Sequence, residues 1–175
     1  MTKMSETDTD KQTDDQQGSV EMFLPTTLEE AHRLLPLARL GHKESYFAEL
    51  PFDEATFIKI CTYVKEKPSE YGAIYADYKG EPAAFALFLL RPFFNSPRLR
   101  VTMMYGIYVR SDLRGTPAGG YMWNRMIQIT RAWGIPRSSY GIMFNVTTGI
   151  AMEASDTLLR ANGCTYLGGN YFLRS

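Results

Sequence analysis

Hydrophobic and polar residues recur with two different periods along this chain, and the change of period separates helices from strands. Between residues 27 and 66, apolar side chains recur every three or four positions, which is typical of amphipathic helices. A first helix is expected to begin after Thr27, because Thr27 and Glu30 have the spacing of a capping box, and a second to begin at Asp53. Pro36 is expected to kink or end the first helix, because proline cannot donate the helical hydrogen bond.

After residue 72 the pattern becomes that of strands, and Lys79-Gly80 favours a tight hairpin turn between two of them. Pro92 and Pro97 are expected to bracket a loop. The expected strands span residues 20–24, 73–78, 83–90, 99–109, 139–146 and 165–173, and the two later helices span residues 118–133 and 150–161. This order of elements predicts an α/β or α+β domain built around one mixed sheet.

Composition adds a boundary and an asymmetry of charge. The first 19 residues hold few apolar side chains and an excess of acids, so we expect a disordered acidic tail before one domain at residues 20–175. No apolar run reaches the roughly 20 residues of a membrane-spanning helix, and a secretory signal pattern is missing, so a cytoplasmic protein is expected. From Arg91 onward the chain has ten arginines against three acids, a net charge of +7. A basic surface of this kind suits a polyanion such as CoA or nucleic acid.

The cysteines and histidines of the sequence do not have the spacing of a metal site or a catalytic site. Cys61 and Cys164 lie in apolar contexts without metal-ligand spacing, which favours buried, reduced thiols. His32 and His42 lack the spacing of a metal site or a catalytic triad, so surface or packing roles are favoured. No metal is therefore expected.

The segment most informative about function runs from the strand at residues 99–109 through a glycine-rich turn into the helix at residues 118–133. The backbone N–H groups of such a turn converge at the positive end of the helix dipole, where a pyrophosphate binds well. Gly115, Gly119 and Gly120 have no side chain to hold a phosphate away. The spacing fits neither a Walker sequence nor the dinucleotide pattern G-x-G-x-x-G.

This segment resembles the signature Gln/Arg-x-x-Gly-x-Gly/Ala of the GNAT superfamily of N-acetyltransferases, which follows the fourth strand and opens the third major helix. Arg114 and Gly119 match the signature, whereas Pro117 replaces its first glycine and removes one N–H group. The resemblance covers residues 20–174 and implies a GNAT-like acyl-CoA N-acyltransferase fold, with a mixed central sheet of about six to seven strands and about four flanking helices. Divergent members of this kind also include bacteriophage-encoded proteins, so the resemblance admits a phage origin.

The resemblance further implies acetyl-CoA as co-substrate and an amine of an unidentified small molecule or protein as acceptor. Gly106 suggests a bulge in the strand; in the family, a bulge here splays two strands, and pantetheine pairs with the opened edge. An exposed amide near Val109 would then polarise the thioester carbonyl. The residues expected to bind the cofactor are Ile107, Val109, Arg114, Gly115, Thr116, Ala118, Gly119, Gly120 and Tyr121.

The side chains that many family members use for proton transfer are missing from their usual positions. Tyr105 stands where a glutamate base is frequent, and Leu159 stands where a tyrosine acid is frequent. Tyr105 and Tyr108 are candidates for a proton relay through water that Asn145 orients, although strand tyrosines more often serve packing. The catalytic candidates are therefore Tyr105, Tyr108, Val109 and Asn145.

Three functions stay open at this point. An active acyltransferase is favoured over a catalytically inactive structural or CoA-binding relative, and nucleic-acid binding ranks last because no recognised motif supports it. Arg98, Arg100 and Arg110 form either a solvated face or contacts to a 3′-phosphate or an acidic acceptor. A homodimer is permitted but not required.

Overall fold

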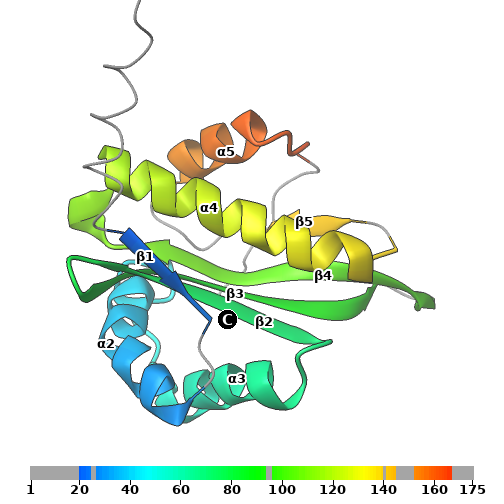
Figure 1. The fold of residues 1–175 in the computed structure, drawn as a ribbon, viewed down its shortest axis with the longest axis horizontal. Helices are drawn as coiled ribbons and strands as arrows, with labels where there is room; N and C mark the ends of the chain where they lie inside the picture. Colours follow the sequence, from blue (N-terminus) through cyan, green and yellow to red (C-terminus); the bar gives the residue numbers. More distant parts are fainter. Residues whose placement is uncertain (1–19, 25–26, 94–95, 140, 145–151, 167–175) are drawn as a thin grey trace, which may run out of the picture.

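A mixed sheet covered by helices on both faces makes up the described part of the chain (Figure 1). The computed structural model describes residues 20–24, 27–93, 96–139, 141–144 and 152–166. Within these residues the sheet has five strands in the order β1-β2-β3-β4-β5. The strands are β1 (Val20–Phe23), β2 (Tyr71–Tyr78), β3 (Glu81–Phe93), β4 (Ser96–Val109) and β5 (Ile142–Phe144).

Neighbouring strands are antiparallel except β4 and β5, which run parallel, so the predicted mixed sheet is confirmed. The predicted turn between β2 and β3 is also confirmed. Lys79 and Gly80 both have positive φ angles, 54° and 81°, as a two-residue hairpin of the primed type requires. The strand count is below the six to seven expected, and residues 167–173 of the expected last strand lie outside the described residues.

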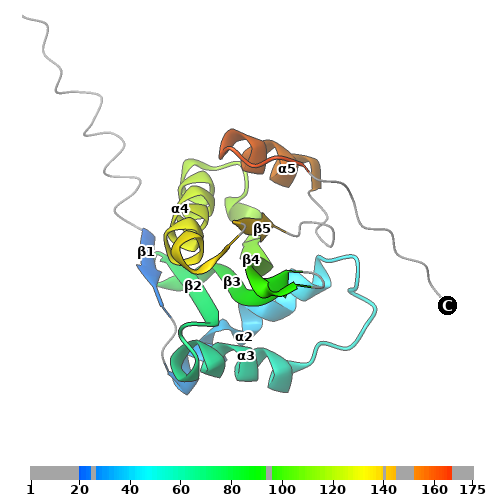
Figure 2. The same ribbon diagram turned by 90° about the vertical axis from the view of Figure 1, so that its right-hand side faces the viewer.

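Two pairs of helices cover the two faces (Figures 1 and 2). Helices α2 (Leu28–Lys43) and α3 (Glu54–Glu66) lie on one face, and α4 (Pro117–Gly134) and α5 (Met152–Ala161) lie on the other. The predicted capping box opens α2, because the Glu30 N–H donates to Thr27 Oγ1 at 3.1 Å and Thr27 N–H donates back to the Glu30 carboxylate at 2.9 Å. None of the described helices is both long and apolar enough to cross a membrane.

Each face of the sheet has its own apolar core. The core beneath α2 and α3 includes Phe57, Tyr75, Phe85, Leu87 and Tyr108. The core beneath α4 includes Ile74, Phe88, Met104, Met122, Trp123, Met126 and Ile127, so α4 buries one apolar stripe against the sheet. Side chains of β4 pack in both cores. The backbone of this strand is therefore held in a fixed position between two packed layers.

Pro36 was expected to kink or end the first helix, and the helix does not end there. Pro36 lies inside α2 and is exposed, while Leu34, Leu35 and Leu37 around it are buried. Burial of three leucines, at about 1.5–3 kcal/mol each, outweighs the roughly 3 kcal/mol cost of a proline in a helix. Water can also solvate the carbonyl that loses its donor, because this side of α2 faces solvent.

The predicted loop between Pro92 and Pro97 was wrong. Strand β3 continues to Phe93 and β4 begins at Ser96, so both prolines belong to the end of a long hairpin. Pro92 lies opposite Arg100, next to a register shift before Phe93, and proline is tolerated at such strand ends and irregularities. Thr165 and Tyr166, expected in a strand, have no regular structure, and the expected tail at residues 1–19 lies outside the described residues.

We predict that Gly72→Ala destabilises the protein by about 1–3 kcal/mol, since overpacking forces neighbours off their preferred positions. A Cβ atom at Gly72 would lie 1.9 Å from the ring of Phe88, which packs edge-on against Trp133 at 5.0 Å between ring centroids. Urea unfolding measures the change. Gly120→Ala is the matched control, because a Cβ atom there meets nothing within 4 Å and alanine suits a helix. Equal stability of Gly72→Ala and the wild type would contradict this packing.

Candidate active site

Strand β4 changes its pairing at Tyr105. Met104 lies opposite Phe88 and Gly106 lies opposite Leu87, so Tyr105 is the extra residue of a β-bulge, and the predicted bulge next to Gly106 is confirmed. On its other side, the described residues of β5 pair with β4 from Thr102 to Met104. Beyond Met104, no described residue pairs with this side of β4. We call the segment from Tyr105 to Val109 the free edge of β4.

The register of the β3–β4 ladder shows where the backbone groups of the free edge point. The Arg110 N–H donates to the Ala83 carbonyl at 2.8 Å, so Arg110 belongs to a hydrogen-bonded pair. Bonded and non-bonded pairs alternate in an antiparallel ladder, so Val109 and Ile107 direct their N–H and C=O groups away from β3. In agreement, the Val109 carbonyl accepts a hydrogen bond from Arg114 Nε at 2.8 Å. The free edge therefore presents N–H groups to whatever lies beside it.

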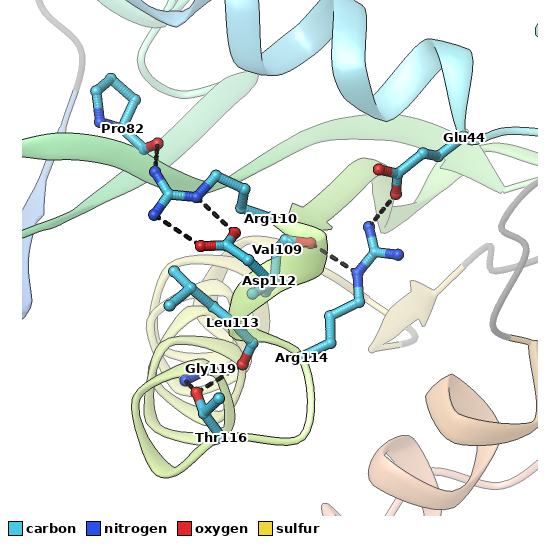
Figure 3. Close-up of polar contacts among 9 residues, drawn as sticks. All are labelled: Glu44, Pro82, Val109, Arg110, Asp112, Leu113, Arg114, Thr116 and Gly119. Atoms are coloured by element: carbon cyan, nitrogen blue, oxygen red, sulfur yellow. Dashed lines mark hydrogen bonds and ion pairs between the residues drawn. The ribbon is translucent and has the colours of Figure 1, made fainter.

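The turn that follows β4 is held by the side chain of Thr116, the N-cap of α4 (Figure 3). The Thr116 hydroxyl donates to the Leu113 carbonyl at 2.7 Å and accepts from the Gly119 N–H at 3.1 Å. A Cβ atom at Gly119 would lie 2.0 Å from the Leu113 oxygen, so only glycine fits there. Gly115 has a φ of 76°, a conformation that favours glycine.

This cap changes which N–H groups of the turn are available to a ligand. Gly119 and Gly120, whose amides were expected to be free, both donate to Thr116, the latter to its carbonyl at 3.0 Å. Pro117 has no N–H group. Among the described residues, nothing accepts a hydrogen bond from the N–H groups of Gly115 and Ala118. They lie at the positive end of an 18-residue helix without an acidic residue in its first turn.

Arg114 does not direct its side chain to the start of α4 (Figure 3). Its Nε atom bonds the Val109 carbonyl, and its Nη2 atom donates to Glu44 Oε2 at 2.5 Å. Its Cζ atom also lies 5.0 Å from the centroid of the Tyr108 ring. The guanidinium thus joins the end of α2, which Glu44 caps, to the free edge. Sequence reasoning missed Glu44, because no local pattern connects it with a residue 70 positions away.

The two candidate tyrosines lie in different environments. Tyr105 is 59% exposed at the bulge, whereas Tyr108 is 8% exposed within the core beneath α2 and α3. Burial, and next the nearby Glu44 carboxylate, raises the pKa of Tyr108 to about 12. Tyr108 therefore stays protonated at neutral pH, which argues against a base and for a packing role. Asn145 lies outside the described residues, and Leu159 is buried.

The remaining candidate side chains have local roles. Arg110 forms a two-bond fork with Asp112, at 2.7 and 3.1 Å, and this ion pair lowers the pKa of the Asp112 carboxyl. Arg98 is exposed. Cys61 is buried, and burial raises the pKa of its thiol to about 12, so it is not a nucleophile. Within the described ranges, no three His, Cys, Asp or Glu side chains lie close enough together to hold a metal ion.

Several solved structures share this fold, each at low sequence identity. A ribosomal-protein-alanine N-acetyltransferase from Brucella melitensis aligns with a TM-score of 0.57 and 18% identity over 89% of this chain and 99% of that chain. AAC(6')-Iy, in complex with the bisubstrate analog CoA-S-monomethyl-acetylneamine, aligns with a TM-score of 0.64 and 14% identity over 89% and 97%. A glucosamine-6-phosphate N-acetyltransferase from Arabidopsis thaliana aligns with a TM-score of 0.62 and 8% identity over the same shares.

Among curated proteins, none matches the sequence closely enough to be called a relative. The family described as the acetyltransferase (GNAT) family, in contrast, matches residues 31–146, which run from α2 through the turn to the last residues of the expected fifth major strand. This match covers more than half of the chain, and the layers, the mixed sheet and the bulged fourth strand agree with it. The chain belongs to the GNAT acetyltransferase family.

Proposed function

We propose that this protein is an N-acyltransferase that moves an acetyl or other short acyl group from acetyl-CoA to an amine. The observation that carries the proposal is the free edge of β4, which directs the Val109 and Ile107 backbone groups away from β3 next to the start of α4. An extended ligand can pair with such an edge as an added strand. The AAC(6')-Iy structure, bound to a CoA-containing bisubstrate analog, supports a CoA-type ligand for the fold.

The residues of the turn suit the diphosphate of acetyl-CoA. The N–H groups of Gly115 and Ala118 have no described acceptor, and the helix dipole adds positive potential. Gly120 and Tyr121 follow on the first turns of the same helix. In this arrangement Arg114 acts from the side of β4, where its guanidinium places a positive charge next to the backbone of Val109.

The acyl transfer itself requires stabilisation of a developing oxyanion. The amine nitrogen attacks the thioester carbonyl carbon, the C–S bond breaks, and CoA leaves with its sulfur carrying the bonding electrons. In the proposed pose the Val109 N–H donates to the carbonyl oxygen as its negative charge grows, a contribution worth about 10²–10³ in rate. This donor is a backbone group, so the absence of the usual glutamate and tyrosine side chains does not remove it.

The proposal favours an active enzyme over the inactive alternative. That alternative depended on missing side chains and on Pro117, and the comparisons give it no support. Pro117 is the first residue of α4, where a missing N–H costs no helical hydrogen bond. Of the relay proposed from sequence, Tyr105 is exposed on the free edge, whereas Asn145 lies outside the described residues.

We predict that acetyl-CoA raises the melting temperature, since a ligand at 100 times its Kd stabilises the native state by about 2.7 kcal/mol. Gly120→Glu should abolish most of this shift, because its carboxylate repels the phosphates. The space around a Gly120 Cβ atom is open, and an acidic residue suits a helix N-terminus, so the fold should tolerate the change. Gly120→Gln, of equal size without the charge, is the control. An equal shift in both variants would contradict the proposed phosphate site.

We predict that the protein releases free thiol from acetyl-CoA only when an amine is present. A panel of a lysine peptide, spermidine and glucosamine, read with a thiol reagent, tests this. Val109→Pro should lower kcat about 10²–10³-fold, because proline removes the proposed oxyanion donor. The Val109 N–H does not bond β3, so the ladder should survive, and the melting temperature verifies this. Val109→Ala is the control, and equal rates in both variants would exclude this N–H from catalysis.

A further inference from the structure

The carboxylate of Glu44, at the end of helix α2, lies close to the free edge of β4. Glu44 caps the C-terminus of α2, and its Oε2 atom accepts from Arg114 Nη2. The same guanidinium bonds the Val109 carbonyl through Nε, so one side chain separates Glu44 from the proposed oxyanion donor (Figure 3). Helix α2 approaches this strand closely at Gly41, where a Cβ atom would lie 3.1 Å from the Tyr108 ring.

The Glu44 carboxylate lies beside the buried hydroxyl of Tyr108. The Tyr108 hydroxyl is buried and makes no hydrogen bond to any described residue, although Glu44 lies close enough to raise the pKa of this phenol. Buried polar groups are normally hydrogen-bonded, and the Glu44 carboxylate is the acceptor next to this hydroxyl. The Glu44 carboxylate accepts from Arg114 through Oε2. Its side chain is 27% exposed, so a ligand can reach it from solvent.

Other carboxylates near the edge are less available. Both carboxylate oxygens of Asp112 accept from Arg110, whereas Glu44 accepts from Arg114 through Oε2. The stretch of β4 from Thr102 to Val109 contains no acidic residue. Among the described residues, Glu44 faces the Arg114 guanidinium from the turn and the Tyr108 phenol from β4, and Asp112 acts on Tyr108 from further away. Glu44 is thus a partly exposed carboxylate that Arg114 links directly to the free edge.

We propose that Glu44 binds the ammonium group of the acceptor and takes its proton, which makes the acceptor a primary amine that is cationic at neutral pH. This inference rests on the proposed function. One proton passes from nitrogen to the Glu44 carboxylate, because an ammonium has no lone pair for attack. The neutral nitrogen then forms the C–N bond while the C–S bond breaks. A second nitrogen proton goes to the departing thiolate, and Glu44 releases its proton to solvent.

If Glu44 served only to hold Arg114 in place, a variant that keeps this contact would keep its activity. Glu44→Gln keeps an oxygen that accepts from Arg114 but removes the charge and the basic site. We expect this variant to keep the acetyl-CoA thermal shift and to lose about 10²–10⁴-fold in kcat/KM with the best cationic amine of the panel. With hydroxylamine, which is largely neutral at pH 7 and needs no base, the loss should be small. A higher pH should likewise reduce the deficit with the cationic amine.

Two further variants complete the experiment. Glu54→Gln is the matched control, because Glu54 forms an exposed ion pair of the same kind with Arg39, at 2.6 Å, between α2 and α3. It should leave both the thermal shift and kcat/KM unchanged. Glu44→Asp keeps the carboxylate and should retain part of the activity, which separates loss of charge from loss of folding.

The outcomes distinguish the two proposals. Wild-type activity in Glu44→Gln, or an equal loss with the cationic amine and hydroxylamine, would overturn the role of Glu44 alone. Absence of amine-dependent thiol release from the wild-type protein would instead overturn the proposed function.

Discussion

The hydrogen-bond register of β4 is the constraint on which the rest of the site depends. This strand stays paired with antiparallel β3 to its last residue, but the described residues of parallel β5 pair with it from Thr102 to Met104. The bulge at Tyr105 directly follows the last described pair with β5, Met104 opposite Phe144. Because the register fixes which amides face β3, it also fixes that Ile107 and Val109 face away. A row of unpaired backbone groups on a strand is a binding edge for extended chains.

The turn after β4 extends this edge to the start of α4 through short contacts. Thr116 and Gly119 hold the turn against the Leu113 carbonyl, so α4 begins at a defined position beyond Val109. Arg114 then uses one guanidinium to bond the strand, the ring of Tyr108 and the end of α2. The proposed chemistry depends mainly on backbone groups, and side chains distant in sequence hold them in place. The proposed oxyanion stabilisation therefore does not depend on the glutamate and tyrosine side chains that many family members use.

The parts of the structure that local chemistry decides were predictable from the sequence. The capping box at Thr27, the turn at Lys79-Gly80 and the bulge near Gly106 each depend on a few adjacent residues. Packing decided the rest: buried leucines carry α2 through Pro36, and the Thr116 cap engages amides that glycine spacing alone suggested were free. The contact between Glu44 and Arg114 joins residues 70 positions apart, and a single sequence has no signal for it.

The central claim is that the free edge of β4 receives the pantetheine arm of a thioester, and a crystal structure with acetyl-CoA tests it most directly. The account predicts density for an extended arm along residues 105–109, with the thioester oxygen within hydrogen-bonding distance of the Val109 nitrogen and the diphosphate near Gly115 and Ala118. Density for acetyl-CoA elsewhere, or a free edge closed by the protein's own chain in its presence, would contradict the account.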